Sequence, residues 1–336
     1  MSKLVSNRIG VIGSGSWATA MIKMLTDNES DKEIYWWVRK QDDISYIQAY
    51  HHNPSYLTAV EIKIPLENIT SDIKNVFDNC DIIILNTPAT YLKSALKGIH
   101  AEDFTNKIIV SAIKGIIPDE NQIVGEYLCE KYNLNGDDIV VIGGPCHAEE
   151  VSQEKLSYLT FGCQNKDKAQ IVSNNYQSRY IKTIVSDDVW GIEYGAVLKN
   201  IYALAGGICH GLGFGDNFQA VLISNAIREM EYFVNAIDPN KRNINVSAYL
   251  GDLLVTAYSQ FSRNRTFGNM IGKGYSVNSA QLEMNMVAEG YYASKCIQGI
   301  ISRYSLDMPI CNMVYQILYG GGNALKEVNI LAQKLS

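Results

Sequence analysis

The sequence of 336 residues is poor in the features that mark several classes of protein. Only 19% of its residues are charged, the formal net charge is −6, and no run of Lys or Arg exceeds two residues. Nucleic-acid-binding proteins usually present a basic face, so we expect no nucleic-acid partner. There is also no uninterrupted apolar stretch long enough to cross a bilayer, and we expect no membrane insertion.

The amino-terminal segment lacks the pattern of a secretory signal. Met1 to Asn7 lead directly into an apolar run, without a basic region followed by a longer apolar one. We therefore expect a cytoplasmic protein.

Cysteine and histidine patterns that would indicate a disulfide framework or a metal site are missing. The seven cysteines are odd in number and scattered, with no CxxC pair, and we expect no metal site. The pair His51-His52 is interpreted as part of a surface loop. Cys146 and His147 are neighbours in sequence, but adjacent side chains rarely point at each other, so a catalytic dyad is not expected there.

A glycine-rich turn follows the first apolar run, residues 8–12. It reads Gly13-Ser14-Gly15-Ser16-Trp17-Ala18 and leads into a helical pattern. Gly13 permits the tight turn, and Gly15 allows backbone amides to approach a pyrophosphate at the helix N-terminus. Glycines also mark ordinary turns, but a strand before and a helix after favour dinucleotide binding, with Ser16 and Trp17 among the contacts.

The end of the second predicted strand bears on the choice of cofactor. A carboxylate there would accept hydrogen bonds from the ribose of NADH, but residues 33–38 are followed by Arg39-Lys40. Two cations suit a 2′-phosphate, and Arg39 can also stack on adenine. We expect NADPH to be preferred over NADH. Use of both cofactors, or a solvated charge pair opening a polar loop at 41–43, remains open.

Apolar strands then alternate with helices. Such alternation predicts a doubly wound, Rossmann-type α/β domain with ligands beyond the carboxyl ends of its strands. The clearest intervening helices are expected at 90–97 and 119–132. One crevice should therefore be close to Thr87-Pro88, Lys114-Gly115 and Gly144-Pro145. The predicted strands after the second are 81–85, 107–112, 139–142, 158–161 and 181–185.

After residue 185 the pattern becomes almost entirely helical. We place the domain boundary there, with a dinucleotide-binding domain over residues 1–186 and an all-helical substrate-binding domain over 187–336. Ser186 is expected to cap the next helix, with Asp187-Asp188 in its first turn. That helix carries several Gly and Ala residues, which let another backbone come close, within one subunit or in a homodimer.

Motifs along nearly the whole chain resemble those of bacterial NAD(P)-dependent sn-glycerol-3-phosphate dehydrogenases. The resemblance implies reversible reduction of dihydroxyacetone phosphate to sn-glycerol 3-phosphate, a precursor of glycerophospholipids, with cofactor and substrate bound between the two domains. The motifs that carry it are Gly13 to Ala20, Lys114-Gly115, Gly143-Gly144-Pro145, Gly195 to Asn200, His210 to Asn217, Leu250 to Leu253, Ser262 to Gly268, Val287 to Gly290 and Met308-Pro309-Ile310.

The resemblance assigns catalytic roles to three residues. Lys199 would be the general acid or base, and burial among Val197, Leu198 and Ile201 would lower its pKa. Lys114 would contact the substrate and help polarise its carbonyl. Asp252 would hydrogen-bond a substrate hydroxyl or orient Lys199, and it could equally be a helix cap.

The remaining expected contacts are also implied by the resemblance. Arg263 would bind the substrate phosphate, with a charge-assisted contact that can be bidentate. The family usually has Ser or Thr where this chain has Cys146, and a thiol is a weaker hydrogen-bonding group. The other expected substrate contacts are Gly144, Ser262 and Asn264, and the expected cofactor contacts beyond the first turn and Arg39 are Lys114, Ala148, Arg263, Val287 and Glu289.

Two alternative functions remain, from different classes. The first is another hydroxy-acid or sugar-acid dehydrogenase, because related two-domain architectures serve those enzymes and the fold alone does not establish the substrate. The second is a regulator that senses NADPH without turnover. Lys199, Lys114 and Arg263 argue against a sensor, which needs neither a proton donor nor a phosphate clamp.

Overall fold

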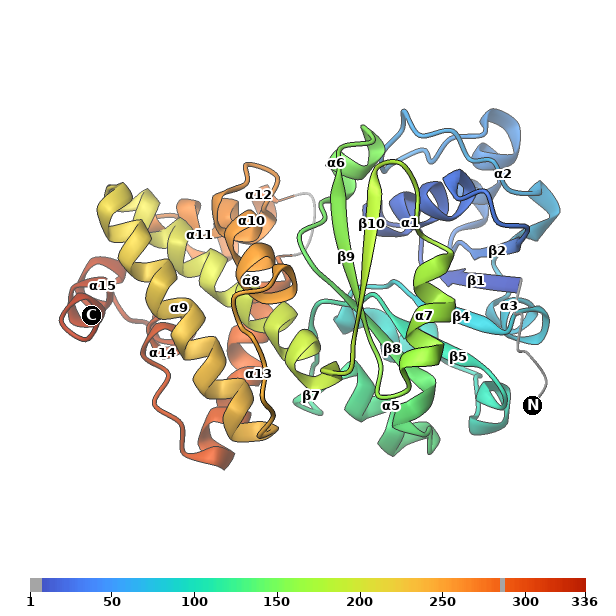
Figure 1. Ribbon diagram of the computed structural model, residues 1–336. Coiled ribbons are helices and arrows are strands. Elements are labelled where there is room, and N and C mark those ends of the chain that lie inside the picture. The colour runs from blue at the N-terminus through green and yellow to red at the C-terminus, as the bar shows by residue number, and fades with distance from the viewer. Residues whose placement is uncertain (1–7, 285–287) are drawn as a thin grey trace. The chain divides into compact units, whose positions relative to one another are not determined.

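The computed structural model describes residues 8–284 and 288–336, which fall into two compact units (Figure 1). We call residues up to 113 together with 124–189 the sheet unit, and residues 114–123 together with those from 190 onward the helical unit. The sequence-based division after Ser186 used two continuous ranges. In the structure, residues 114–123 join the helical unit because β6 contacts α13.

The sheet unit is built on one eight-stranded sheet. Its order is β10-β9-β8-β5-β4-β1-β2-β3, and neighbouring strands are parallel except β8 and β9, which are antiparallel. The chain order reverses between β1 and β4, which is the switch point where doubly wound sheets bind ligands. The strands are β1 (Arg8–Ile12), β2 (Glu33–Trp37), β3 (Ile69–Thr70), β4 (Ile82–Leu85), β5 (Ile108–Ser111), β8 (Ile139–Gly143), β9 (Ser157–Gly162) and β10 (Ile181–Ser186).

Helices cover both faces of this sheet. Successive side chains of a strand alternate between the faces, and the central strands are buried along their whole length, so both faces need a covering layer. Ile9 and Val11 share one core cluster with residues of α1, α6 and α7. Between them, Gly10 faces Val76 of α3 on the opposite side. The helices of the unit are α1 (Ser16–Asp27), α2 (Gln41–Tyr50), α3 (Ile73–Asn79), α4 (Leu92–Ala95), α5 (Val124–Tyr132), α6 (Ala148–Ser152) and α7 (Lys166–Asn174), with 3-10 turns at Leu66–Asn68, Ala89–Tyr91, Ala101–Phe104 and Gly136–Asp138.

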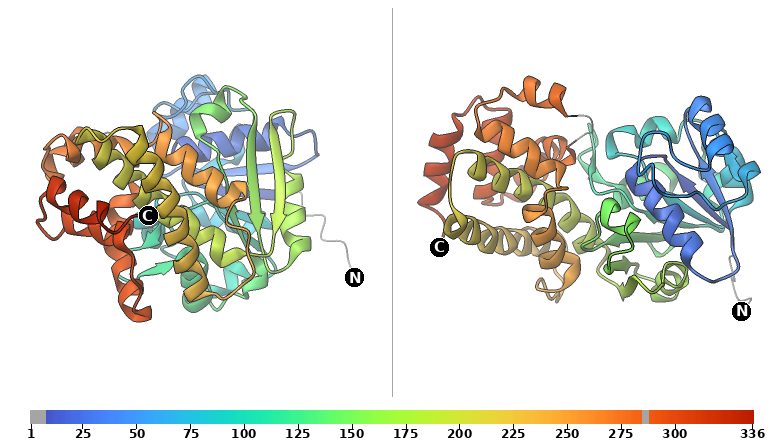
Figure 2. Two further views of the ribbon diagram at one scale, coloured as in Figure 1. Left: turned by 60° about the vertical axis from the view of Figure 1, so that its left-hand side comes forward. Right: turned by 90° about the horizontal axis from the view of Figure 1, so that it is seen from above.

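The helical unit contains one short hairpin besides its helices. The hairpin pairs β6 (Ile116–Ile117) with β7 (Gln122–Ile123). The last three helices of the helical unit pack in chain order, α13 on α14 and α14 on α15, as the orange to red ribbons show (Figure 2). The helices are α8 (Val189–Gly211), α9 (Asp216–Ile237), α10 (Asp252–Tyr258), preceded by a π-helical turn at Ser247–Gly251, α11 (Arg263–Gly272), α12 (Val277–Glu283), α13 (Glu289–Tyr304), α14 (Pro309–Leu318) and α15 (Ala324–Ala332).

The structure confirms the predicted fold class and corrects several local expectations. The helix expected over 119–132 begins only at Val124, because the two residues before it pair in the hairpin. The helix expected over 90–97 is the shorter α4 after a 3-10 turn. Ser186 does not cap α8, because it still pairs in β10 and α8 starts at Val189. Residues 41–43 open α2 instead of a polar loop.

Among the residues that the structure describes, no helix combines the length and apolar character that crossing a bilayer demands. In the same residues, no group of three or more His, Cys, Asp or Glu side chains is arranged so that it could hold a metal ion.

The backbones of α8 and α11 are in direct contact, because glycines face each other where the helices cross. A Cβ atom added to Gly207 of α8 would lie 2.2 Å from the carbonyl oxygen of Arg265, and one added to Gly268 of α11 would lie 2.2 Å from that of Leu204. Gly211 and Gly272 approach the opposite backbone in the same way. The close approach expected from the small residues of this helix is therefore made within the subunit.

Gly207→Ala should destabilise the protein, because the new methyl group meets rigid backbone and the helices must separate. We expect a loss of about 3 kcal/mol, at the upper end of the usual cost of overpacking. The adjacent Gly206→Ala is the matched control. Its Cβ would meet only the Gln219 Oε1 at 3.4 Å, and alanine is the better helix former. Denaturant unfolding of both variants measures the difference, and equal stability would contradict a tight crossing.

Candidate active site

The glycine turn after β1 has the geometry of a dinucleotide site. Gly13 adopts a φ of +126°, and a Cβ there would lie 2.4 Å from the carbonyl oxygen of Asn86, so only glycine fits. Gly15 precedes α1 with an extended backbone, and a Cβ there would have no heavy atom within 4 Å. Ser16 and Trp17 open α1. This open space before a helix N-terminus suits a pyrophosphate, which such a helix end attracts through its amides and dipole.

Arg39 and Lys40 lie just past the carboxyl end of β2, where both side chains are exposed. β2 is hydrogen-bonded to β1 in parallel, and Ile12 is in register with Trp37, so the ends of the two strands are neighbours. The two cations therefore follow the strand next to the glycine turn. This is the edge of the sheet at which a ribose or its 2′-phosphate would lie in a doubly wound fold.

The loop after β8 holds three more expected contacts. Gly144 adopts a φ of +106°, and a Cβ there would lie 2.7 Å from the carbonyl oxygen of Tyr158. Cys146 and Ala148 are 6% and 8% exposed and belong to the apolar core cluster that includes α1. The side chain of Cys146 therefore packs in the core of the sheet unit. The contacts of these residues with ligands stay predictions.

Lys199 and Asp252 form a buried ion pair in the helical unit. Lys199 lies on α8 and is 4% exposed, Asp252 begins α10 and is 1% exposed, and Nζ donates to Oδ1. Oδ2 of Asp252 is buried with no hydrogen-bond partner among the described residues. Asp252 is the first residue of α10 rather than its cap, which is Gly251. The ion pair brings the carboxylate of Asp252 to Lys199, and a role of Asp252 in orienting Lys199 or in binding a substrate hydroxyl stays a prediction.

Burial lowers the pKa of Lys199, because the interior disfavours its charged form. Asp252 opposes this effect, the charge of Lys114 adds to it, and the resulting pKa is about 7. The expected burial of Lys199 and lowering of its pKa are both confirmed. A buried amine with a pKa near neutrality can donate or accept a proton at physiological pH.

A chain of amide hydrogen bonds ties Lys114 to the same helix. Asn200 donates through Nδ2 to the carbonyl oxygen of Lys114 at 2.9 Å, and it accepts through Oδ1 from Nδ2 of Asn264 at 2.9 Å. Oδ1 of Asn264 accepts from the amide of Gly290 at 2.9 Å. Sequence reasoning included Asn200 in a motif but gave it no role. Its place directly after Lys199 was the available signal.

The beginning of α11 contains Ser262, Arg263 and Asn264, which play different parts. Ser262 is buried and caps the helix by accepting from the amide of Arg265 at 3.3 Å. Asn264 is 7% exposed, and its amide nitrogen and oxygen both bond within the protein. Arg263 is exposed in the first turn. An exposed guanidinium at a helix N-terminus is well suited to a phosphate.

The last expected cofactor contacts precede and open α13. Glu289 is half-buried in the first turn of that helix, where the helix dipole favours a carboxylate. Val287 lies outside the described residues. The cofactor roles of both residues stay predictions.

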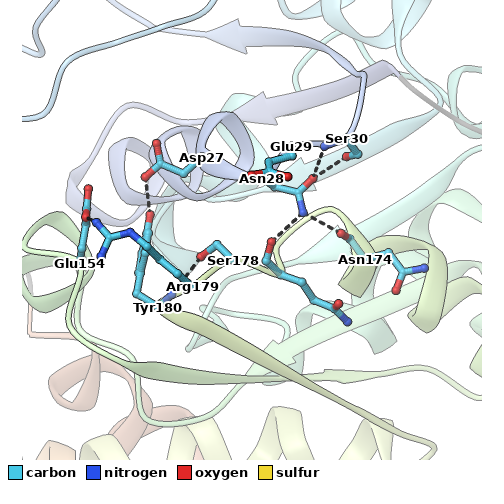
Figure 3. Close-up of a pocket in the computed structure, with 10 residues that line it drawn as sticks. Asp27, Asn28, Glu29, Ser30, Glu154, Asn174, Ser178, Arg179 and Tyr180 are labelled. Carbon is cyan, nitrogen blue, oxygen red and sulfur yellow. Dashed lines mark hydrogen bonds and ion pairs between the residues drawn. The ribbon is translucent and has the colours of Figure 1, made fainter.

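A polar cavity of about 690 Å³ lies elsewhere on the sheet unit (Figure 3). It is lined by the carboxyl-terminal ends of α1 and α7 and by the segment before β10. Glu154 bridges Lys23 and Arg179 there, and Tyr180 donates to Asp27 at 2.7 Å. Because α1 begins at the carboxyl end of β1, its far end is at the opposite edge of the sheet from the glycine turn. The cavity therefore contributes nothing to the candidate site.

Comparisons with known proteins point to one family along nearly the whole chain. The family model of the NAD-dependent glycerol-3-phosphate dehydrogenase N-terminus matches residues 8–169, and that of the C-terminus matches residues 188–329. Glycerol-3-phosphate dehydrogenase (NAD(P)+) of Bacillus subtilis is 34% identical over 319 residues, covering 94% of this chain and 90% of its own. The enzyme of that name from Listeria monocytogenes serotype 4a is 31% identical over 330 residues, covering 98% and 96%.

A solved structure shows the same fold. Glycerol-3-phosphate dehydrogenase from Coxiella burnetii superposes with a TM-score of 0.89 at 24% identity, covering 98% of this chain and 99% of its own. A 2-dehydropantoate 2-reductase from Geobacter metallireducens is more distant, with a TM-score of 0.58 at 11% identity and coverage of 94% and 100%.

Asp252→Asn should lower the pKa of Lys199 further below 7, because it removes the negative charge that favours the ammonium form. The shift should be about one unit or more for a buried pair. The NMR signal of Cε-labelled lysine, assigned by its loss in Lys199→Met, gives the midpoint directly. Asp138→Asn, which breaks the ion pair with Lys168, is the control and should leave the midpoint unchanged. A wild-type midpoint near 10.5 would contradict the burial argument.

Proposed function

Because the chain belongs to the NAD-dependent glycerol-3-phosphate dehydrogenase family, we propose that it reduces dihydroxyacetone phosphate to sn-glycerol 3-phosphate, reversibly, with NADPH or NADH. The product would supply glycerophospholipid synthesis. The observation that carries the proposal is the buried Lys199, with a pKa of about 7 beside Asp252. This is the proton donor and acceptor that carbonyl reduction at neutral pH needs.

The reaction requires one hydride and one proton. A bound nicotinamide cofactor supplies the hydride to C2 of the ketone. As the C2–O π bond breaks, its electron pair moves onto oxygen, and Lys199 stabilises that charge and transfers a proton from Nζ to it. In the oxidation direction the neutral amine of Lys199 removes the hydroxyl proton. Reduction therefore needs the protonated lysine and should slow as pH rises above about 7, whereas oxidation should quicken.

Neighbouring residues set the position and basicity of Lys199. Asp252 orients its ammonium group through the ion pair. Lys114 lowers its pKa and would help polarise the substrate carbonyl. The hydrogen bond from Asn200 to the carbonyl oxygen of Lys114 couples that residue to the helix that carries Lys199.

The substrate phosphate is assigned to the N-terminus of α11. Arg263 would form the principal charge-assisted contact from its exposed position. Ser262 and Asn264 would act by fixing the first turn, since Ser262 caps α11 and Asn264 binds the amide of Gly290. Gly144 and Cys146 are further proposed substrate contacts.

The cofactor is assigned to the sheet unit. Gly13, Gly15, Ser16 and Trp17 would hold its pyrophosphate, and Arg39 would bind a 2′-phosphate and favour NADPH. Lys114, Ala148, Arg263, Val287 and Glu289 remain further proposed contacts.

The cellular setting is proposed from the cysteines. None of the seven is placed in a disulfide, and six of them are buried. Cysteines stay reduced in reducing compartments, which supports a cytoplasmic location. A homodimer and the lack of a nucleic-acid partner are further expectations.

The wild-type protein should oxidise NADPH or NADH with dihydroxyacetone phosphate, followed at 340 nm, and not with unphosphorylated dihydroxyacetone. Arg263→Ala should raise the KM for the phosphorylated ketone by about 10-fold to 100-fold, the value of one or two charge-assisted hydrogen bonds. Its kcat should change less. Arg179→Ala, which removes an arginine from the opposite edge of the sheet unit, is the control.

An unchanged KM in Arg263→Ala would refute the phosphate assignment while leaving the activity intact. Cofactor binding without turnover of the phosphorylated ketone would refute the proposed activity and favour a sensor or another substrate.

Arg39→Ala should weaken NADPH binding by about 10-fold while leaving NADH within about twofold, because only NADPH carries the 2′-phosphate that the guanidinium would bind. Dissociation constants from the fluorescence of the reduced cofactors give the ratio. Arg179→Ala again serves as the control. An unchanged ratio would remove Arg39 from the basis of cofactor choice.

A further inference from the structure

The segment after α2 folds back onto the sheet unit and carries a buried asparagine. His51 adopts the left-handed conformation that ends α2, and the amide of Ile62 donates to the carbonyl oxygen of His51 at 2.8 Å, closing the loop. Within this loop Asn53 is 3% exposed. A buried amide side chain is costly unless its hydrogen-bonding groups are satisfied, so its partners indicate what it is for.

Asn53 uses its whole hydrogen-bonding capacity, which is two donated and two accepted bonds. Nδ2 donates to the carbonyl oxygen of Ser14 at 3.0 Å and to Oγ1 of Thr19 at 2.9 Å. Oδ1 accepts from the amides of Ser55 and Tyr56, both at 3.0 Å. The acceptor bonds shape the loop itself. The donor bonds reach across the sequence to the glycine turn.

Three successive carbonyl groups of the turn are held by side chains of the protein. Trp36 of β2 donates through Nε1 to the carbonyl oxygen of Gly13 at 2.6 Å. Asn53 holds that of Ser14, and Oγ1 of Thr19 donates to that of Gly15 at 3.1 Å. Thr19 also accepts from Asn53, so Asn53 acts on two of these carbonyls, one directly and one through Thr19.

This arrangement determines where the amides of the turn point. In a trans peptide the C=O and N–H bonds lie on opposite sides of the chain, and the described residues contain no cis peptide bond. The carbonyl of Ser14 points toward Asn53, so the N–H of Gly15 in the same peptide points away from it. The absence of a side chain at Gly15 leaves open space at that residue, with no atom within 4 Å of a Cβ position.

We propose that Asn53 is a positioning residue for the cofactor. By fixing the peptide between Ser14 and Gly15, it presents the Gly15 amide to the pyrophosphate before the cofactor arrives. This inference rests on the proposed function, because it requires a dinucleotide at the turn. The pyrophosphate is common to NADPH and NADH, so Asn53 supports both, in contrast to Arg39.

The test is Asn53→Asp, which keeps the acceptor oxygen for Ser55 and Tyr56 but replaces the donor with an oxygen facing the carbonyl of Ser14. Asn68→Asp is the matched control. Asn68 is also buried and donates to a backbone carbonyl of the same sheet, that of Ile34 at 3.2 Å. Cofactor dissociation constants are measured by NADPH and NADH fluorescence, and thermal melting and the KM for dihydroxyacetone phosphate are measured beside them.

Asn53→Asp should weaken NADPH and NADH by the same factor, about 10-fold or more for one amide bond to an anion, with the KM for the ketone little changed. Asn68→Asp should leave both dissociation constants near the wild-type values. If Asn53→Asp does not fold, Thr19→Val provides the second test. It removes the link to Gly15 while keeping the bond to Ser14, and should weaken both cofactors in the same direction by a smaller factor.

Unchanged cofactor binding in folded Asn53→Asp, or in folded Thr19→Val, would overturn the inference and leave the proposed function standing. Equal losses in Asn53→Asp and Asn68→Asp would assign Asn53 a merely structural role and also overturn it. Wild-type protein that binds neither cofactor would instead refute the proposed function.

Discussion

The candidate site of the helical unit depends on how closely α8 and α11 approach. Without side chains at Gly207 and Gly268, the two backbones touch at their crossing. α8 carries Lys199 and Asn200, and α11 carries Arg263 and Asn264. The bond between Asn200 and Asn264, at 2.9 Å, joins short side chains and forms only if the helices are this close. Glycines in helices usually reduce stability, but here they determine where Lys199 and Arg263, the proposed proton donor and phosphate ligand, lie.

The proposed reaction places two opposing requirements on Lys199, and the helical unit meets both. An amine with its ordinary pKa would stay protonated at neutral pH and could not serve the oxidation direction, whereas a fully desolvated amine without a partner would lose its proton too readily to serve reduction. Burial and the charge of Lys114 lower the pKa, and Asp252 limits the change. The balance leaves it near 7, where both protonation states are populated. The ion pair is therefore better understood as a control on basicity than as a source of stability.

The sequence was most informative where one residue type has a single physical consequence. Gly13 predicted a turn that no other residue fits, and the family resemblance, together with the apolar neighbours of Lys199, predicted a buried amine. It was less informative where structure depends on pairing between distant segments. Asn200 and Asn264 are ordinary polar residues in sequence, and only the fold shows that their amides bond to each other. The hairpin before α5 was missed for a related reason, since strands of two residues carry no periodic pattern.

The glycine turn shows how the two kinds of information combine. Its motif specifies backbone shape and leaves open which way each peptide plane faces, because glycine accepts many conformations. An anion site needs the amides to face one way, so the carbonyls of the same peptides must be held on the other side. Trp36 and Asn53 hold them from positions 23 and 39 residues further along the chain than the carbonyls that they bind. The proposed anion binding by the turn therefore depends on the motif together with the loop behind it, and a glycine motif without such supports would present its amides in many directions.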